Sequence, residues 1–170
     1  MDSLFAPWRF SYLVEEKAPG GCVFCAALSG PGGPDDLIVY RGVHNFAILN
    51  LFPYNNGHLM VVPNAHLASP SASTAEQRAE MAELSAVGEE VLREAYRPDG
   101  LNLGMNLGRA AGAGIEQHFH LHIVPRWAGD TNFMTVLAGT RVIPEDLRAT
   151  RERVRTGFQK RLRALPRAGA

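Results

Sequence analysis

Three of the six histidines in this chain lie within one alternating run, His118-Phe119-His120-Leu121-His122. Strict alternation predicts a β-strand, because successive side chains of a strand point to opposite faces. The three imidazoles then share one face, about 6.5 Å apart at a rise of about 3.3 Å per residue. Imidazole titrates closer to neutral pH than any other side chain, so this face favours a chemical site over the alternative of a solvated edge strand.

Length and composition predict a single domain over residues 1–170, with 46% hydrophobic residues for a core. Lys+Arg and Asp+Glu both number 17, so no global field favours nucleic acid or a membrane surface, and a small molecule is the expected partner. No apolar stretch approaches the roughly 20 residues of a membrane span, and the N-terminus lacks a signal-peptide pattern. We therefore expect a cytoplasmic protein, with an N-terminal packing segment (1–21), a core (22–126) and a C-terminal extension that contains a helix (127–170).

Apolar periodicity and turn residues predict an α+β fold, with an antiparallel sheet of about five strands. The other strands are expected at residues 37–40, 46–50, 58–63 and 101–107. Helical spacing predicts a long helix over 74–97, packed on the sheet, with Ser73 and Glu76 as its capping box. A last helix is expected after Pro144, with Val154 and Phe158 among its apolar residues.

Two further motifs could carry chemistry. Cys22 and Cys25 form a Cys-x-x-Cys, which in a reducing compartment is more often a metal or redox site than a structural disulfide. The loop from Gly108 to Gly114 contains three glycines and Arg109, so its backbone could approach phosphate oxygens closely. The loop matches neither the Walker A nor the dinucleotide pattern, and an ordinary turn stays the alternative.

Together with Asn50-Leu51, residues 56–63 and Asn106-x-Gly108, the histidine run resembles the histidine triad (HIT) family of nucleotide hydrolases and transferases. The resemblance covers roughly residues 22–126 and implies the HIT-like fold. Residues 125–133 and 140–145 resemble a longer bacterial branch that includes diadenosine tetraphosphate phosphorylases.

The resemblance implies that the middle histidine, His120, is the nucleophile. It would attack the α-phosphorus of a nucleotide and hold the nucleoside monophosphate until water, phosphate or another acceptor removes it. This chemistry needs a free Nε2 lone pair, with the Nδ1 proton held by a backbone carbonyl. His122 and His58 are expected against the phosphate, as donors where charge develops.

The implied nucleotide contacts are Asn106 to the phosphates, Asn50 to the ribose hydroxyls and Leu51 in the base pocket. Phe46 and Ile48 are also base-pocket candidates, although core is the favoured interpretation for both.

The chain departs from the family at the leaving-group position. Many relatives carry Gln-Ser or Gln-Thr where this chain has Gly114 and Ile115, so a hydroxyl is missing. Backbone N–H groups between Gly112 and Gly114 are the expected replacement, and the alternative is weaker leaving-group chemistry.

Some relatives carry a structural zinc, and the resemblance implies the ligands Cys22, Cys25, His66 and His118 here. Four N and S ligands are typical of a closed tetrahedral zinc site. The alternative is two solvated histidines and two buried thiols. His44 has no such partner and is expected on a surface loop.

The preferred function is cleavage of dinucleoside polyphosphates of the diadenosine tetraphosphate type, through a nucleotidyl-His120 intermediate, by phosphorolysis or hydrolysis. Inorganic phosphate is a candidate acceptor, and a homodimer is expected from the family. Two alternatives stay open: a nucleoside phosphoramidate hydrolase acting on substrates such as adenylyl-lysine, and a non-enzymatic nucleotide-binding module.

Overall fold

The computed structural model describes residues 21–33, 36–130 and 145–164. The strands are β1 (Ile38–Arg41), β2 (Asn45–Leu49), β3 (Leu59–Pro63), β4 (Gly100–Gly104) and β5 (Leu121–Arg126). The helices are α2 (Val23–Ser29), α3 (Ala75–Tyr96) and α5 (Leu147–Ala164), with short 3-10 turns η1 (Pro70–Ala72) and η2 (Arg109–Ala111). The predicted N-terminal packing segment, apart from Gly21, and residues 131–144 of the predicted extension lie outside the described residues.

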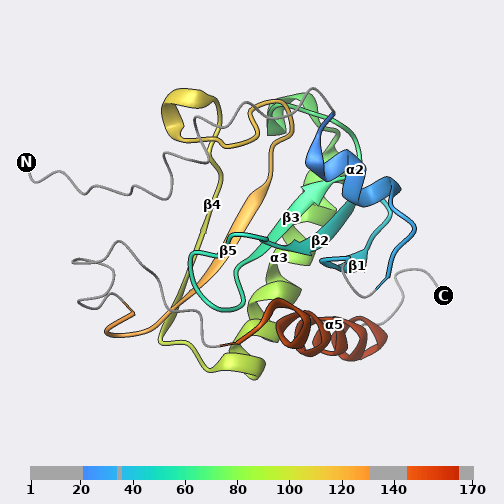
Figure 1. Cartoon of the computed structure of the whole chain (residues 1–170). Helices are drawn as coiled ribbons and strands as arrows, with labels where there is room; N and C mark the ends of the chain where they lie inside the picture. The colour runs from blue at the N-terminus through green and yellow to red at the C-terminus, as the bar shows by residue number, and fades with distance from the viewer. Residues whose placement is uncertain (1–20, 34–35, 131–144, 165–170) are drawn as a thin grey trace, which may run out of the picture.

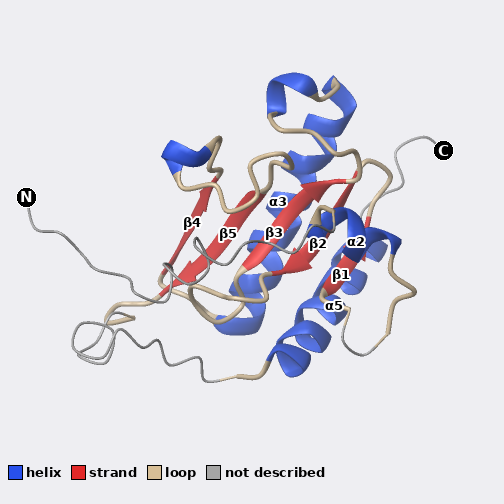
Figure 2. Cartoon of the chain, turned by 45° about the horizontal axis from the view of Figure 1, so that its top comes forward, coloured by secondary structure: helices blue, strands red, loops and turns tan. Residues whose placement is uncertain are grey.

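All five strands belong to one antiparallel sheet, in the order β1-β2-β3-β5-β4 (Figure 1). The long helix α3 packs behind the sheet with α5 beside it, and α2 lies on the opposite face (Figure 2). This arrangement confirms the predicted α+β fold, with its five-stranded antiparallel sheet, long packed helix and C-terminal helix.

Strand β2 shows how the sheet separates two apolar clusters. Ala47 and Leu49 point into the larger cluster, under α3 and α5. Phe46 and Ile48 alternate with them and pack against Phe24 of α2 on the other face. All five residues of β2 are buried because both faces of the sheet are covered here.

Helix α3 begins with a capping box one residue later than predicted. The Oγ1 of Thr74 accepts the N–H of Gln77, and the Gln77 side chain accepts the N–H of Thr74 (2.8 Å). The predicted pair of Ser73 and Glu76 is wrong, because the Ser73 hydroxyl already donates to the carbonyl of Pro70 (2.6 Å) and closes η1. The sequence allows a capping box either at Ser73 with Glu76 or at Thr74 with Gln77. Because the Ser73 hydroxyl is already bonded to Pro70, the box forms at Thr74.

The strand predicted from the histidine run begins at Leu121 instead of His118. Leu121, the first residue of strand β5, pairs with β3. The N–H of Phe119 donates instead to the carbonyl of Leu67, in the segment after β3 (2.7 Å). The predicted alternation holds across this junction, since Phe119 is in the α3-side core and His120 faces the opposite side of the sheet.

Strand β4 is shorter than predicted and forms one edge of the sheet. It ends at Gly104, and Leu101 packs against the core. Leu103 and Leu107, both within the strand predicted at 101–107, are 47% and 46% exposed.

Helix α5 follows Asp146, whose Oδ1 accepts the N–H groups of Arg148 and Ala149. The predicted apolar residues Val154 and Phe158 are fully buried against α3 and β1. None of the helices in the described part of the chain is long and apolar enough to cross a membrane.

Candidate active site and metal centre

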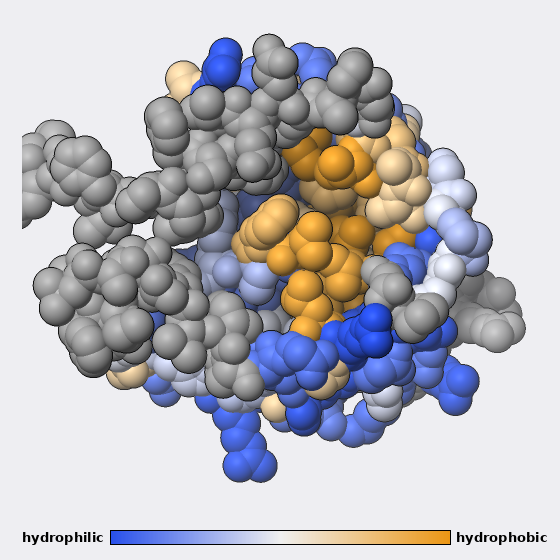
Figure 3. All heavy atoms as spheres, in the orientation of Figure 1, coloured by the Kyte–Doolittle hydropathy of each residue, from blue (hydrophilic) through white to orange (hydrophobic). Residues whose placement is uncertain are grey.

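A cavity of about 480 Å³ opens on the α2 side of the sheet. Its volume lies within the range of small-molecule sites. Its wall combines polar side chains, among them Asn50, Asn106, His120 and His122, with the apolar surface of α2 and β2. Figure 3 shows hydrophobic side chains gathered in a hollow on this face of the molecule. Such a surface suits a ligand with one polar and one flat apolar part.

His120 is held in one tautomer. Its Nδ1 lies 3.0 Å from the carbonyl oxygen of His118, and a carbonyl can only accept, so Nδ1 carries the proton. The Nε2 atom then keeps a free lone pair at the cavity wall. The ring is 6% exposed and packs against Phe24 at a centroid distance of 4.9 Å. Burial lowers the pKa of His120, despite the opposing effect of its bond to His118, so the ring is neutral at pH 7.

A chain of hydrogen bonds sets the tautomers of the other two histidines at the site. The backbone N–H of Tyr54 donates to Nδ1 of His58 (3.1 Å), so His58 carries its proton on Nε2. That Nε2 lies 2.9 Å from Nδ1 of His122, which must therefore accept. His122 is left with a proton on Nε2, the nitrogen that is free to serve a ligand.

Burial, followed by the charge of His120, lowers the pKa of His122 to about 4. The rings of His120 and His122 are 4.7 Å apart, so at neutral pH a nucleophilic lone pair and an N–H donor lie side by side. This combination suits attack on phosphorus next to a developing negative charge.

The structure brings most of the predicted nucleotide-site residues to one wall. Those bordering the cavity are Asn50, Leu51, Asn106, Gly112, Gly114, His120 and His122. His58, at 1% exposure, is not part of the cavity wall and lies behind His122 and Asn50, whose side chains it contacts at 2.9 Å and 3.3 Å. Ile48 serves both the core and the cavity wall, whereas Phe46 belongs to the core alone.

The segment from Gly112 to Ile115 borders the cavity without a side-chain hydroxyl. The Ile115 side chain packs against the α2-side cluster. Gly112 has φ of 85°, a conformation that favours glycine and brings the backbone to the wall. Arg109 is exposed and lies outside the cavity wall.

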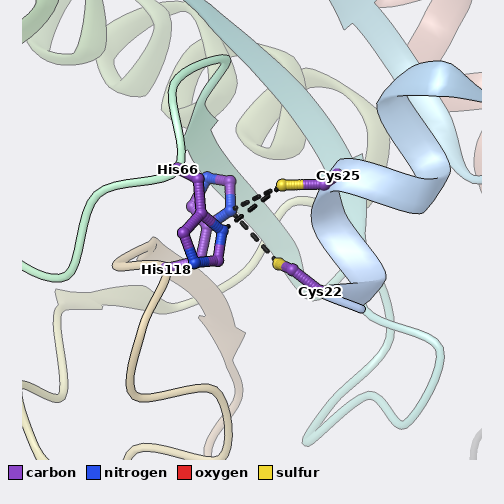
Figure 4. Close-up of side chains that lie close together, drawn as sticks. All are labelled: Cys22, Cys25, His66 and His118. Carbon is purple, nitrogen blue, oxygen red and sulfur yellow. Dashed lines mark hydrogen bonds between the residues drawn. The ribbon is translucent and has the colours of Figure 1, made fainter. Parts of the chain in front are cut away.

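A second cluster joins Cys22, Cys25, His66 and His118, as Figure 4 shows. The Nδ1 atom of His118 lies 3.2 Å and 3.6 Å from the two sulfurs, and His66 Nδ1 lies 3.4 Å from Cys25 Sγ. All four ligand atoms are within 4.8 Å of one another. Zn–S bonds of about 2.3 Å and Zn–N bonds of about 2.0–2.1 Å place S and N about 3.6 Å apart in a tetrahedron. The donor set and its spacing therefore fit zinc.

His118 is oriented for this role. Its Nε2 donates to the carbonyl of Pro63 (2.8 Å), which leaves Nδ1 as a lone pair facing the two thiols. The ring is fully buried, and both cysteines are free of disulfides. Because the carbonyl of His118 also accepts from His120, one residue connects the metal cluster to the cavity.

The residues at the site that were not predicted as part of it include Phe24, Tyr54 and Asn55. Phe24 lies between the two cysteines in the sequence, and this position in the Cys-x-x-Cys motif could have indicated that it is near the site. Tyr54 acts through its backbone N–H, and Asn55 through contacts 70 and 75 residues away in sequence. Neither interaction has a local sequence pattern.

Comparisons with known proteins agree with this geometry. Residues 33–129 match the HIT domain, and the chain belongs to the HIT family. The chain is 36% identical over 167 residues to AP-4-A phosphorylase of Mycobacterium tuberculosis, which covers 94% of this chain and 86% of that protein.

Two solved structures share the fold. A Zn-bound histidine triad family protein from Mycobacterium smegmatis is 28% identical, with a TM-score of 0.68 over 85% of this chain and 98% of that one. A hypothetical histidine triad nucleotide-binding protein from Sulfolobus tokodaii strain7 is 26% identical, with a TM-score of 0.70 over 88% of this chain and 99% of that one.

Proposed function

We propose that this HIT protein cleaves dinucleoside polyphosphates of the diadenosine tetraphosphate type at the α-phosphate, through a nucleotidyl-His120 intermediate. The observation that carries the proposal is the His120 ring, whose Nδ1 is held by the His118 carbonyl so that Nε2 is free at the cavity. The substrate class is supported by the extent of the similarity to AP-4-A phosphorylase, which spans nearly the whole chain.

In the first step Nε2 of His120 forms a bond to the α-phosphorus, and the bond from that phosphorus to the bridging oxygen breaks. The leaving polyphosphate takes the electron pair of that bond. The Nε2–H of His122, fixed by His58, donates to the oxygens where charge develops. The His118 carbonyl keeps the Nδ1 proton of His120 and stabilises the phosphorylated ring, which is positively charged.

In the second step an acceptor takes the nucleotidyl group from His120 and restores the neutral ring. We propose that inorganic phosphate serves at least as readily as water. The name of the M. tuberculosis relative supports this choice, as does the glycine-lined stretch of wall at Gly112 and Gly114, whose backbone can approach a second anion.

We also propose that Cys22, Cys25, His66 and His118 hold a structural zinc ion. The Zn-bound relative from M. smegmatis supports this. When bound, zinc would contribute folding energy and join α2 to the segment that leads into β5. Phe24, which lies between the two cysteines in sequence, would then be held against His120.

A homodimer and a cytoplasmic location stay predictions. The homodimer is supported by the edge position of β4 and by the exposure of Leu103 and Leu107 beside it. An unpaired strand edge with apolar neighbours is a surface that a second copy could cover.

The direct test is a single turnover of diadenosine tetraphosphate with protein in excess, followed by rapid quenching and mass spectrometry of the peptides. We expect adenylylation of wild-type protein at His120. Nucleotide binding without any labelled His120 would favour the non-enzymatic module instead. Faster turnover of adenylyl-lysine than of diadenosine tetraphosphate would favour the phosphoramidate hydrolase.

A further inference from the structure

The loop between β2 and β3 decides the orientation of His58. The N–H of His58 donates to the carbonyl of Asn55 (3.1 Å), and its carbonyl accepts from the N–H of Asn50 (3.0 Å). The Tyr54 N–H must lie in the plane of the His58 ring to meet Nδ1. Nδ2 of Asn50, at the start of the same loop, also lies 3.3 Å from Nδ1 of His58. The tautomer of His58, and through it that of His122, therefore depends on where this loop is held.

Asn55 anchors the loop to the end of β5. Its side chain is 8% exposed, and Nδ2 donates to the Pro125 carbonyl (2.9 Å) and to Oδ2 of Asp130 (2.8 Å). Both amide protons are thereby used on partners outside the loop. Asn55 thus contacts β5 through its side chain and His58 through its backbone.

Asp130 is itself fixed on several sides. The Arg126 guanidinium binds both carboxylate oxygens, and the N–H of Trp127 donates to Oδ2 (3.3 Å). Arg126 is held in turn by Oδ1 of Asn102 on β4 (2.9 Å). The Arg126 guanidinium, with Asn55, holds the pKa of Asp130 well below its usual range, so the carboxylate stays an acceptor for Asn55.

We propose that Asp130 and Asn55 are positioning residues, which hold the Tyr54 N–H on His58 and thereby fix the proton of His122 on the nitrogen that serves the ligand. The kinetic consequence rests on the proposed function. The effect on the histidine tautomers does not, and it can be measured without turnover.

The experiment compares Asp130→Asn and Asn55→Ala with the control Asp99→Asn. The control also neutralises an acceptor in the turn after β5, since Asp99 Oδ2 accepts the N–H of Ala128 (2.7 Å), but it leaves the bond between Asn55 and Asp130 in place. The readouts are the 15N chemical shifts of the imidazole nitrogens at pH 7, and kcat and KM for diadenosine tetraphosphate.

We expect wild-type protein and Asp99→Asn to show His58 and His122 protonated on Nε2. Asp130→Asn and Asn55→Ala should show mixed tautomers, with kcat lower by about ten- to hundredfold and KM nearly unchanged, because a displacement of the order of 1 Å can cost about two powers of ten. The double variant should be little worse than either single one, since both act through one contact.

Wild-type tautomers in both variants would overturn the proposal, and so would an equal loss of kcat in Asp99→Asn. If Asn55→Ala does not fold, the isosteric Asp130→Asn variant decides alone. If wild-type protein fails to turn over diadenosine tetraphosphate, the proposed function fails, while the 15N spectra still decide the positioning role.

Discussion

The carbonyl oxygen of His118 accepts the Nδ1 proton of His120 at 3.0 Å, while the ring of His118 points away, toward Cys22 and Cys25. The two residues lie two positions apart, and their side chains serve different sites. The backbone of His118 sets the tautomer of the proposed nucleophile, and its imidazole is part of the metal cluster. Whatever fixes the His118 ring therefore also fixes the acceptor for His120.

We predict that His120→Ala abolishes turnover of diadenosine tetraphosphate while nucleotide binding persists. Removal of a nucleophile normally costs several powers of ten in rate, and Asn50, Asn106 and His122 stay at the cavity. His44→Ala, in the turn between β1 and β2, is the control and should keep wild-type activity. Steady-state kinetics and calorimetric binding provide the measurements. More than about one-hundredth of the wild-type rate in His120→Ala would exclude the covalent route.

We predict about one zinc ion per chain, and a loss of both zinc and stability in Cys22→Ser. The metal contributes folding energy, so the melting temperature should fall by at least about 5 °C, or about 2 kcal/mol for a domain of this size. Elemental analysis and thermal denaturation, with His44→Ala as the control, measure both quantities. Protein purified without chelators that contains no zinc would contradict the metal site and leave two plain thiols.

Glu80 on α3 supports the turn between β1 and β2. Its carboxylate accepts the N–H groups of Val43, His44 and Asn45, at 2.6–2.8 Å, and also the Asn45 side chain (3.0 Å). We predict that Glu80→Gln lowers the free energy of unfolding by about 1–3 kcal/mol, because charge-assisted hydrogen bonds are lost. Glu83→Gln, exposed on the same helix, should change it by less than about 0.5 kcal/mol. Equal effects in urea denaturation would show that the turn does not depend on Glu80.

The same contact predicts a pH dependence. Burial raises the pKa of Glu80, but the hydrogen bonds from Asn45 and the turn outweigh it, so the folded-state pKa is below its ordinary value of 4.5. The unfolded state then binds more protons in acid, and stability from Glu80 is present above pH 4.5 and lost as the pH falls through the folded-state pKa. The advantage of wild type over Glu80→Gln in urea denaturation should therefore shrink below pH 4.5. A constant difference down to pH 3 would contradict this.

The parts of the site that depend on local periodicity or on family motifs could be predicted from the sequence. Alternation correctly separated Phe119 from His120, and the family pattern brought Cys22 and His118 into one cluster although 96 residues separate them. Prediction from the sequence failed where two local hydrogen-bonding arrangements compete for the same side chain. Ser73 has the right residue type for a cap, but its hydroxyl is used by η1.

Other features depend on tertiary contacts that no local pattern encodes. The start of β5 depends on the loop after β3, which takes the N–H of Phe119. The bond between Asn55 and Asp130 requires the whole sheet to be in place, since it joins the β2–β3 loop to the end of β5. The exposure of Leu103 follows from the edge position of β4, which periodicity alone does not reveal.

The final prediction concerns the second step of the proposed reaction. With diadenosine tetraphosphate, attack of inorganic phosphate on adenylyl-His120 gives ADP with ATP, whereas attack of water gives AMP with ATP. We expect ADP to equal or exceed AMP at saturating phosphate, and AMP to replace it when phosphate is omitted. Separation of the nucleotides by anion-exchange chromatography measures the ratio, and Arg109→Ala serves as a control because this exposed residue lies outside the cavity wall. If AMP stays the partner of ATP at saturating phosphate, the protein is a hydrolase, and the covalent step at His120 is unaffected because both acceptors use the same intermediate.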